Sequence, residues 1–129
     1  MTATILLIED NEQNRYLATY LLEHHQFKVV AAVDGPQGIA LAAKLVPQLV
    51  LLDIQLPGMD GYSVARELRQ LDALRATPII AVTSYAMAGD RETALAAGCD
   101  GYIEKPINPE TFCVEISTYL DAAMRVRTP

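Results

Sequence analysis

The sequence predicts an α/β fold: a doubly wound, five-stranded parallel sheet in the order 2-1-3-4-5, flanked by five helices. Short, wholly apolar segments alternate with longer amphipathic stretches, and this alternation is typical of a parallel sheet that helices cover on both faces. The chain has 129 residues, whereas an eight-stranded α/β barrel needs about 250. We therefore expect one domain over 1–129, with a core at about 4–124 and a short C-terminal tail at 125–129.

Each predicted strand is a short run of aliphatic or aromatic residues, and each predicted helix has a helical spacing of apolar positions. Gly35 before Pro36 and Asn108 before Pro109 place a cap residue ahead of a proline that suits a first helical turn. Gly98 suits a left-handed helix end. In chain order, the elements are strand 5–8, helix 12–24, strand 27–32, helix 36–46, strand 49–52, helix 61–71, strand 79–82, helix 86–97, strand 102–103 and helix 109–124.

Composition excludes several classes of function. Sixteen acidic residues against ten basic ones give a net charge of −6, so nucleic-acid and membrane partners are not expected. The apolar N-terminal stretch ends at Glu9 and is too short for a signal peptide or a membrane span, which predicts a cytoplasmic protein. Cys99 and Cys113 have no metal or disulfide spacing and are interpreted as buried hydrophobes. His24 and His25 are interpreted as solvated surface residues.

Polar residues follow four of the five predicted strands. In a doubly wound sheet the carboxyl ends of the strands share one edge, and ligands bind there. Taken singly, each residue has an ordinary explanation, such as the start of a solvated loop or a surface charge. Their restriction to strand ends favours a common site formed by Glu9 and Asp10, Asp53, Thr83 and Ser84, and Lys105.

This set of residues predicts a magnesium and phosphoryl site. Three carboxylates, from Glu9, Asp10 and Asp53, repel one another unless a cation lies between them. Oxygen ligands without Cys or His favour Mg²⁺, which keeps several waters and shares its coordination with phosphate. We expect Lys105 to pair with Asp53 at rest and with a phosphoryl oxygen afterwards. The Thr83 hydroxyl would donate to another phosphoryl oxygen.

The motifs resemble those of the receiver domain of two-component response regulators, with its CheY-like fold, over about residues 4–124. Within that family the sequence is most similar to stand-alone, single-domain cell-cycle regulators. The motifs are Glu9-Asp10-Asn11, Asp53 within Leu-Leu-Asp-Ile-Gln-Leu-Pro-Gly-Met-Asp-Gly, Thr83-Ser84 and Lys105-Pro106.

The resemblance implies that Asp53 accepts a phosphoryl group from a sensor histidine kinase or a histidine phosphotransfer protein. It implies that Asp10, Asp53 and the backbone carbonyl of Gln55 bind Mg²⁺, for which Mn²⁺ can substitute, and that Glu9 acts mainly through water. Lys105 would neutralise charge on the phosphoryl group. A cis peptide is implied before Pro106. The protein would thus phosphorylate and dephosphorylate itself without being a turnover enzyme.

The resemblance also implies a switch. Thr83 and Ser84 would contact the phosphoryl group, and the ring of Tyr102 would rotate into the space that Thr83 vacates. Signalling would then pass through the surface of the fourth helix, fifth strand and fifth helix to an unknown target protein. Tyr85, two residues beyond Thr83, is predicted to slow hydrolysis of the acyl phosphate.

Three alternatives bear on this interpretation. A phosphatase of the haloacid dehalogenase type needs a second Asp two residues after the nucleophile, where this chain has Gln55. A flavodoxin-like carrier needs a hydroxyl- and glycine-rich phosphate loop after the first strand, where this chain has Glu9-Asp10-Asn11-Glu12. The third alternative is a receiver excised from a hybrid histidine kinase or a longer regulator. Because about five residues follow the last predicted helix, output is expected through protein contacts.

Overall fold

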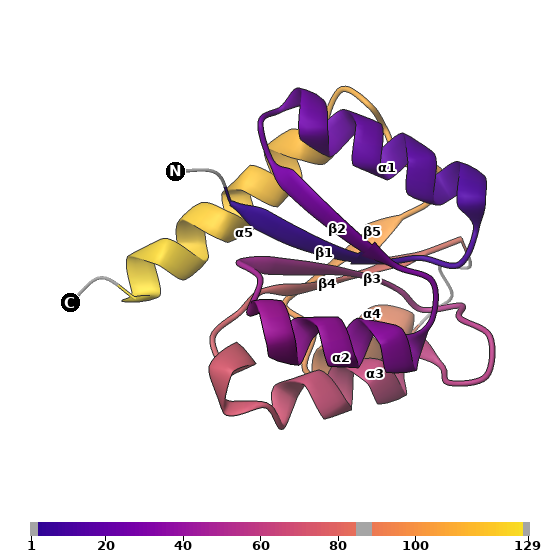
Figure 1. The fold of residues 1–129 in the computed structure, drawn as a ribbon, viewed down its shortest axis with the longest axis vertical. Helices are drawn as coiled ribbons and strands as arrows, with labels where there is room; N and C mark the ends of the chain where they lie inside the picture. Colours follow the sequence, from indigo (N-terminus) through magenta and orange to yellow (C-terminus); the bar gives the residue numbers. More distant parts are fainter. Residues whose placement is uncertain (1–2, 85–88, 128–129) are drawn as a thin grey trace.

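The computed structural model describes residues 3–84 and 89–127. It contains one five-stranded parallel sheet in the order β2-β1-β3-β4-β5 (Figure 1). This is the predicted CheY-like fold. The strands are β1 (Thr4–Ile8), β2 (Lys28–Ala32), β3 (Leu49–Asp53), β4 (Ile79–Thr83) and β5 (Gly101–Glu104).

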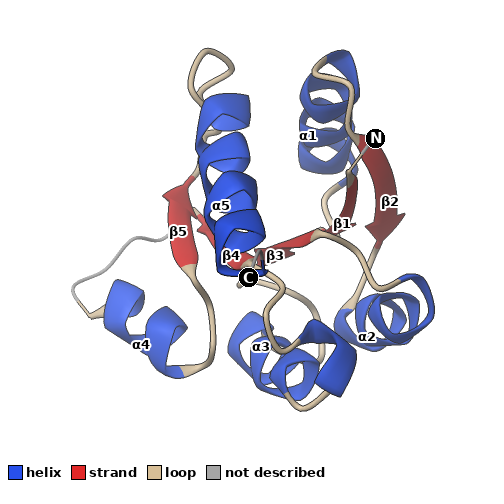
Figure 2. Cartoon of the chain, turned by 90° about the vertical axis from the view of Figure 1, so that its left-hand side faces the viewer, coloured by secondary structure: helices blue, strands red, loops and turns tan. Residues whose placement is uncertain are grey.

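Helices cover both faces of the sheet. Figure 2 shows α1 and α5 on one side and α2, α3 and α4 on the other. A short 3₁₀ helix, η1, follows α3. The bounds are α1 (Glu12–His24), α2 (Gly35–Leu45), α3 (Gly61–Arg69), η1 (Asp72–Leu74), α4 (Asp90–Ala96) and α5 (Phe112–Arg127).

Two hydrophobic clusters follow from this arrangement. Every residue of β3 and β4 is buried, which explains why these strands read as continuous apolar runs. Alternate strand residues point to opposite faces, so Leu52 packs with α2, α3 and α4 while Leu51 packs with α1 and α5. The sheet is therefore the shared middle layer of a three-layer domain.

The register places the strand ends side by side. Ile8 pairs with Leu52, Asp53 with Val82, and Thr83 with Glu104. Because the strands are parallel, the residues that follow β1, β3, β4 and β5 emerge at one edge.

The starts of two helices differ from the sequence expectations. The N-cap of α2 is Asp34, whose carboxylate accepts from Gln37 N, rather than Gly35, which has no side chain to accept a hydrogen bond. Residues 109–111 form a turn, and α5 starts at Phe112, three residues later than expected. Asn108 caps this turn, as predicted: its side chain accepts from the N–H of Glu110 at 2.9 Å.

The other two differences lie at a C-terminus and in a connection. α5 continues to Arg127, so most of the expected tail is helical. No residue unfavourable to a helix occurs before Thr128, which precedes a proline. The 3₁₀ helix η1 was not predicted. The expected start of the fourth helix at 86 lies outside the described residues, which place α4 from Asp90, after Gly89.

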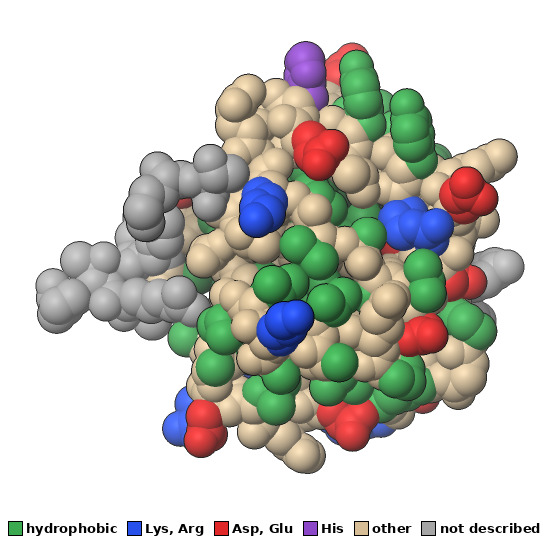
Figure 3. Space-filling view, in the orientation of Figure 1, with side chains coloured by type: hydrophobic (Ala, Val, Ile, Leu, Met, Phe, Trp, Pro, Cys, Tyr) green, Lys and Arg blue, Asp and Glu red, His purple; other side chains and the backbone are tan. Residues whose placement is uncertain are grey.

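The surface carries side chains of both charges, as the 16 acidic and 10 basic residues of the sequence lead one to expect. On the face in Figure 3, acidic and basic side chains are interspersed, and hydrophobic side chains stand beside a histidine at the top, over α1. Tyr16 and Tyr20 of α1 are exposed, as are His24 and His25. No described helix is both long and apolar enough to cross a membrane.

Both cysteines are free and buried, as predicted. Burial raises the pKa of the Cys99 thiol to about 11.

Candidate functional site

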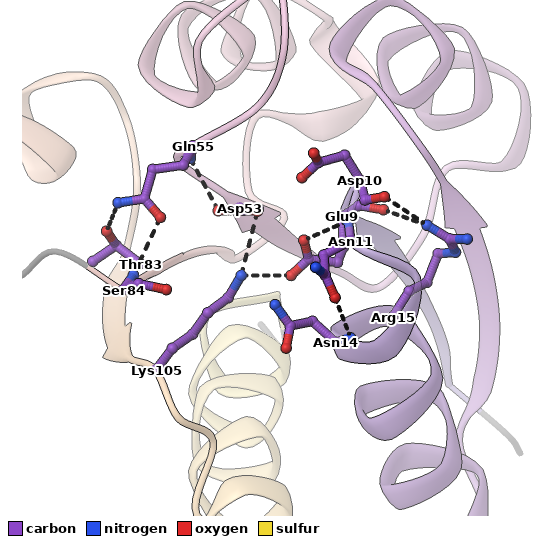
Figure 4. A network of polar contacts seen from close by, with 10 residues as sticks. All are labelled: Glu9, Asp10, Asn11, Asn14, Arg15, Asp53, Gln55, Thr83, Ser84 and Lys105. Atoms are coloured by element: carbon purple, nitrogen blue, oxygen red, sulfur yellow. Dashed lines mark hydrogen bonds and ion pairs between the residues drawn. The ribbon is translucent and has the colours of Figure 1, made fainter.

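The predicted strand-end residues converge in one pocket at the carboxyl edge of the sheet (Figure 4). Glu9 and Asp10 follow β1, Asp53 ends β3, and Lys105 follows β5. One carboxylate oxygen from each of the three acids lies within 4.8 Å of those from the other two. Glu9 and Asp53 are buried, while Asp10 is exposed.

Local contacts fix the loop that carries the first two acids. Asn11 caps α1 by accepting from Asn14 N at 2.9 Å, and its own N–H donates to Glu9 Oε2 at 3.1 Å. Arg15 Nη1 donates to the backbone carbonyls of Glu9 and Asp10 at 3.0 and 3.2 Å. Asn11 and Arg15 were not assigned these roles from the sequence, although the cap type of Asn11 was a usable signal.

Lys105 lies between two buried carboxylates. Its Nζ is 2.6 Å from Glu9 Oε1 and 3.3 Å from Asp53 Oδ2. The expected pairing with Asp53 alone is therefore incomplete, because Glu9 is the nearer partner. One ammonium bridges both acids, which a buried lysine between two carboxylates is expected to do. The peptide bond between Lys105 and Pro106 is cis, as the resemblance implies.

The pocket carries more negative charge than Lys105 neutralises. The pKa of Glu9 is raised to about 7, chiefly by burial and also by the hydrogen bond and negative charge of Asp53, while Lys105 opposes the rise. A carboxyl that is reluctant to ionise beside a second acid indicates a site that favours another cation.

The donor set fits magnesium. Glu9, Asp10 and Asp53 offer only oxygen ligands in a cluster that is part buried and part open, as Mg²⁺ prefers when it keeps several waters. The coordinating role of the Gln55 carbonyl stays a prediction. What the structure shows for Gln55 is that its main-chain N–H donates to Asp53 Oδ1 at 2.9 Å.

The side chain of Gln55 makes contacts that the sequence did not predict. Its Nε2 donates to Thr83 Oγ1 at 2.8 Å, and its Oε1 accepts from the main-chain N–H of Ser84 at 3.3 Å (Figure 4). Thr83 is buried. These contacts could have been suspected from the sequence, because Gln55 follows the strand-end Asp53 by two residues and so lies beside the end of the neighbouring strand.

Tyr102 lies on β5 next to β4 and packs against the cluster formed with α2, α3 and α4. Its hydroxyl is buried and has no hydrogen-bond partner within the described part of the chain. Burial raises its pKa, and so do the charges of Asp90 and Glu104. Rotation of this ring stays a prediction. The predicted role of Tyr85 falls outside the described residues.

Comparisons with known sequences agree with this site. The family model of the response regulator receiver domain matches residues 5–117. The chain is 39% identical over 123 residues to the polar-differentiation response regulators DivK of Brucella ovis and Brucella anthropi. Each alignment covers 95% of this chain and 100% of the relative.

Solved structures show the same fold. A CheY-like receiver domain protein from Methanospirillum hungatei is 29% identical with a TM-score of 0.90, covering 97% of this chain and 98% of that one. The receiver domain of a sensor histidine kinase from Pseudomonas aeruginosa is 34% identical with a TM-score of 0.87, covering 94% and 99%. That structure has a magnesium ion coordinated in its active-site cleft.

Proposed function

The chain belongs to the response regulator receiver domain family of two-component signalling, and we propose from this that it is a switch controlled by phosphorylation of Asp53. The donor would be a sensor histidine kinase or a histidine phosphotransfer protein in the cytoplasm. The observation that carries the proposal is the pocket itself, in which Asp53 is buried beside Lys105 and two further acids.

The proposed step is a displacement at phosphorus. A carboxylate oxygen of Asp53 attacks the phosphorus of a phosphohistidine, and a P–O bond forms as the P–N bond breaks. The electron pair of the broken bond returns to the histidine nitrogen, and a proton from solvent completes the neutral ring. Later attack by water on phosphorus releases inorganic phosphate and restores the carboxylate. The protein itself is phosphorylated and later dephosphorylated, so in this scheme it is a signalling switch and not a turnover enzyme.

The residues around Asp53 divide the work of charge neutralisation. Mg²⁺, or Mn²⁺ in its place, would be held by Asp10, Asp53 and the Gln55 carbonyl, with Glu9 acting mainly through water, and would supply positive charge to the transferring group. Lys105 would pair with the Asp53 carboxylate before the transfer and with a phosphoryl oxygen after it. The distance of 3.3 Å between its Nζ and Asp53 Oδ2 supports this role.

The partner that delivers the phosphoryl group has to approach the edge of the sheet where α1 begins. Tyr16 and Tyr20 are 74% and 57% exposed on this helix, and Leu17 is 38% exposed. Aromatic residues are enriched in protein interfaces, so this face of α1 supports docking of a protein donor. Nucleic-acid and membrane partners have no place in the proposal.

Output would start at Thr83 and Ser84 and pass through Tyr102 to the surface of α4, β5 and α5. Tyr102 pairs through β5 with Ala81 of β4, two residues before Thr83. A target protein of unknown identity would read this surface.

Incubation with acetyl phosphate, with and without Mg²⁺, tests the proposal. We expect a covalent phosphoryl adduct, detected by intact-protein mass spectrometry, only with Mg²⁺ and not in Asp53→Asn. Asp72→Asn is the matched control, because Asp72 forms only an exposed pair with Arg75 on η1; it should be labelled like wild type. An adduct on Asp53→Asn, or one formed equally without the metal, would contradict the mechanism.

A further inference from the structure

We propose that the side-chain amide of Gln55 holds the place of the phosphoryl group in the unphosphorylated protein. It does so by occupying Thr83 and Ser84, and it must release both before they can bind phosphate. Gln55 is then a positioning residue that sets how readily the site accepts a phosphoryl group. The inference rests on the proposed phosphorylation of Asp53.

Gln55 connects the end of β3 with the end of β4. The main-chain N–H of Gln55 binds the carboxylate of Asp53 at 2.9 Å, and its side chain reaches across to the end of β4 (Figure 4). There the amide contacts both groups that are proposed to receive the phosphoryl oxygens, at 2.8 Å for Thr83 Oγ1 and 3.3 Å for Ser84 N. Thr83 is buried, and its bond to Gln55 is partly buried, whereas the bond between Gln55 and Ser84 is exposed.

At Ser84 the competition is direct. A main-chain N–H has one proton, and Gln55 Oε1 now accepts it. A phosphoryl oxygen is also an acceptor and needs the same proton. The carbonyl oxygen of the amide therefore stands in for an oxygen of the phosphoryl group and has to leave when that group arrives.

At Thr83 the competition concerns position. The amide nitrogen of Gln55 can only donate, so the Thr83 oxygen acts as an acceptor in this contact. A phosphoryl oxygen can only accept, so Thr83 has to turn its own proton toward Asp53. The contact with Nε2 holds the Thr83 oxygen toward Gln55 and opposes this movement.

Loss of the amide should therefore favour the phosphorylated geometry. A hydrogen bond between neutral groups changes an equilibrium several-fold. We expect Gln55→Met, which keeps the length of the side chain but cannot form either bond, to bind the phosphoryl mimic beryllium fluoride about fivefold more tightly in the presence of Mg²⁺. Calorimetric titration of the full chain measures this affinity.

Two further variants separate hydrogen bonding from bulk. Gln55→Ala should resemble Gln55→Met, because both lack the amide. Gln70→Met is the matched control, since Gln70 is exposed at the end of α3 and should leave the affinity unchanged. If Gln55→Ala binds more tightly but Gln55→Met does not, the bulk of the side chain is responsible and the proposal is wrong.

A second measurement starts from the free protein, without metal or mimic. In ¹⁵N-resolved NMR spectra of the free protein, Gln55→Met should shift the main-chain N–H signal of Ser84, whereas Gln70→Met should not. On addition of Mg²⁺ and beryllium fluoride to wild type, the Gln55 side-chain amide signals should move toward values typical of solvent-exposed glutamine. Unchanged Ser84 and Gln55 signals would overturn the proposal.

The outcomes distinguish this inference from the function on which it rests. If wild type binds no beryllium fluoride with Mg²⁺, both are wrong. If wild type binds it and Gln55→Met binds it equally well, only the role of Gln55 is overturned.

Discussion

Arg69 connects several segments of the chain outside the site. From the end of α3 it donates to the backbone carbonyls of Gly98, Leu74 and Thr77 at 2.7–2.8 Å. It also pairs with Asp100, which in turn accepts from a backbone N–H of β4. One guanidinium thus satisfies three loop carbonyls, using the several fixed donors that distinguish Arg from Lys.

We predict that Arg69→Met lowers the free energy of unfolding by about 2 to 4 kcal/mol, because it leaves these carbonyls and Asp100 without their donor. Arg75→Met is the control: its pair with Asp72 is exposed on both sides and should change stability by less than about 0.5 kcal/mol. Urea denaturation of both variants measures the difference. Equal losses in the two would show that Arg69 contributes no more than a surface charge.

For single residues, the sequence predicts the position of the strand-end charged residues better than it predicts the side chains that link distant segments. Asp53 and Lys105 could be placed because parallel strands bring their ends to one edge. The contacts of Arg69 and of the Gln55 side chain could not be placed, because their partners are distant in the sequence. Thr83 lies 28 residues from Gln55, and Asp100 lies 31 residues from Arg69. Those contacts depend on loop paths and rotamers that no local pattern specifies.

Among the elements, the approach of α3 to the end of β3 bears most directly on the site. α3 begins at Gly61, whose N–H donates to the carbonyl of Ile54 at 3.0 Å. A Cβ at this position would lie 2.5 Å from Ile54 Cα and 2.7 Å from the Asp53 carbonyl oxygen. The absence of a side chain therefore lets the helix start against the backbone that carries Asp53.

Gly61→Ala is expected to push this backbone away and to weaken Mg²⁺ binding about tenfold, as supporting residues of metal sites do when changed. Gly101→Ala is the comparison, because there the added Cβ meets the Tyr119 ring at the start of β5, on the opposite edge of the sheet. It should lower stability and leave metal affinity unchanged. Calorimetric titration with MgCl₂ decides, and equal affinities in both variants would refute the link between Gly61 and the site.

The elements themselves were predicted where periodicity is strong. All five strands and the helices α1, α2 and α3 lie where the alternation places them. One error occurs where a side-chain hydrogen bond decides the boundary, because Asp34 and not Gly35 caps α2. The cap role of Asn108 was predicted correctly, but a turn comes between it and the start of α5 at Phe112. η1 was missed because three residues are too few to give a periodic signal.

For the whole molecule, the acidic pocket is expected to make the free energy of unfolding depend on the Mg²⁺ concentration. The unfolded chain does not hold Glu9, Asp10 and Asp53 together, so we expect Mg²⁺ to bind the native state preferentially. At a concentration about 100-fold above its Kd, the ion should add about 2.7 kcal/mol to the free energy of unfolding.

Thermal unfolding with MgCl₂, compared with NaCl at equal ionic strength, measures this gain. Asp10→Asn should lose most of it, because Asp10 is the exposed member of the cluster and is the proposed ligand that is not part of the buried core. A stabilisation that NaCl reproduces would instead reflect general screening of the net charge of −6.

The edge formed by α4 and β5 differs from the centre of the sheet. α4 has only seven residues and begins after Gly89, which has no side chain to cap it, while β5 pairs with β4 alone. β3, in contrast, is buried throughout and lies between two strands. Amide hydrogens of β3 should thus exchange with solvent only through global unfolding, whereas those of α4 exchange through cheaper local openings. Part of the surface proposed to signal to a partner is therefore expected to open more readily than the centre of the sheet.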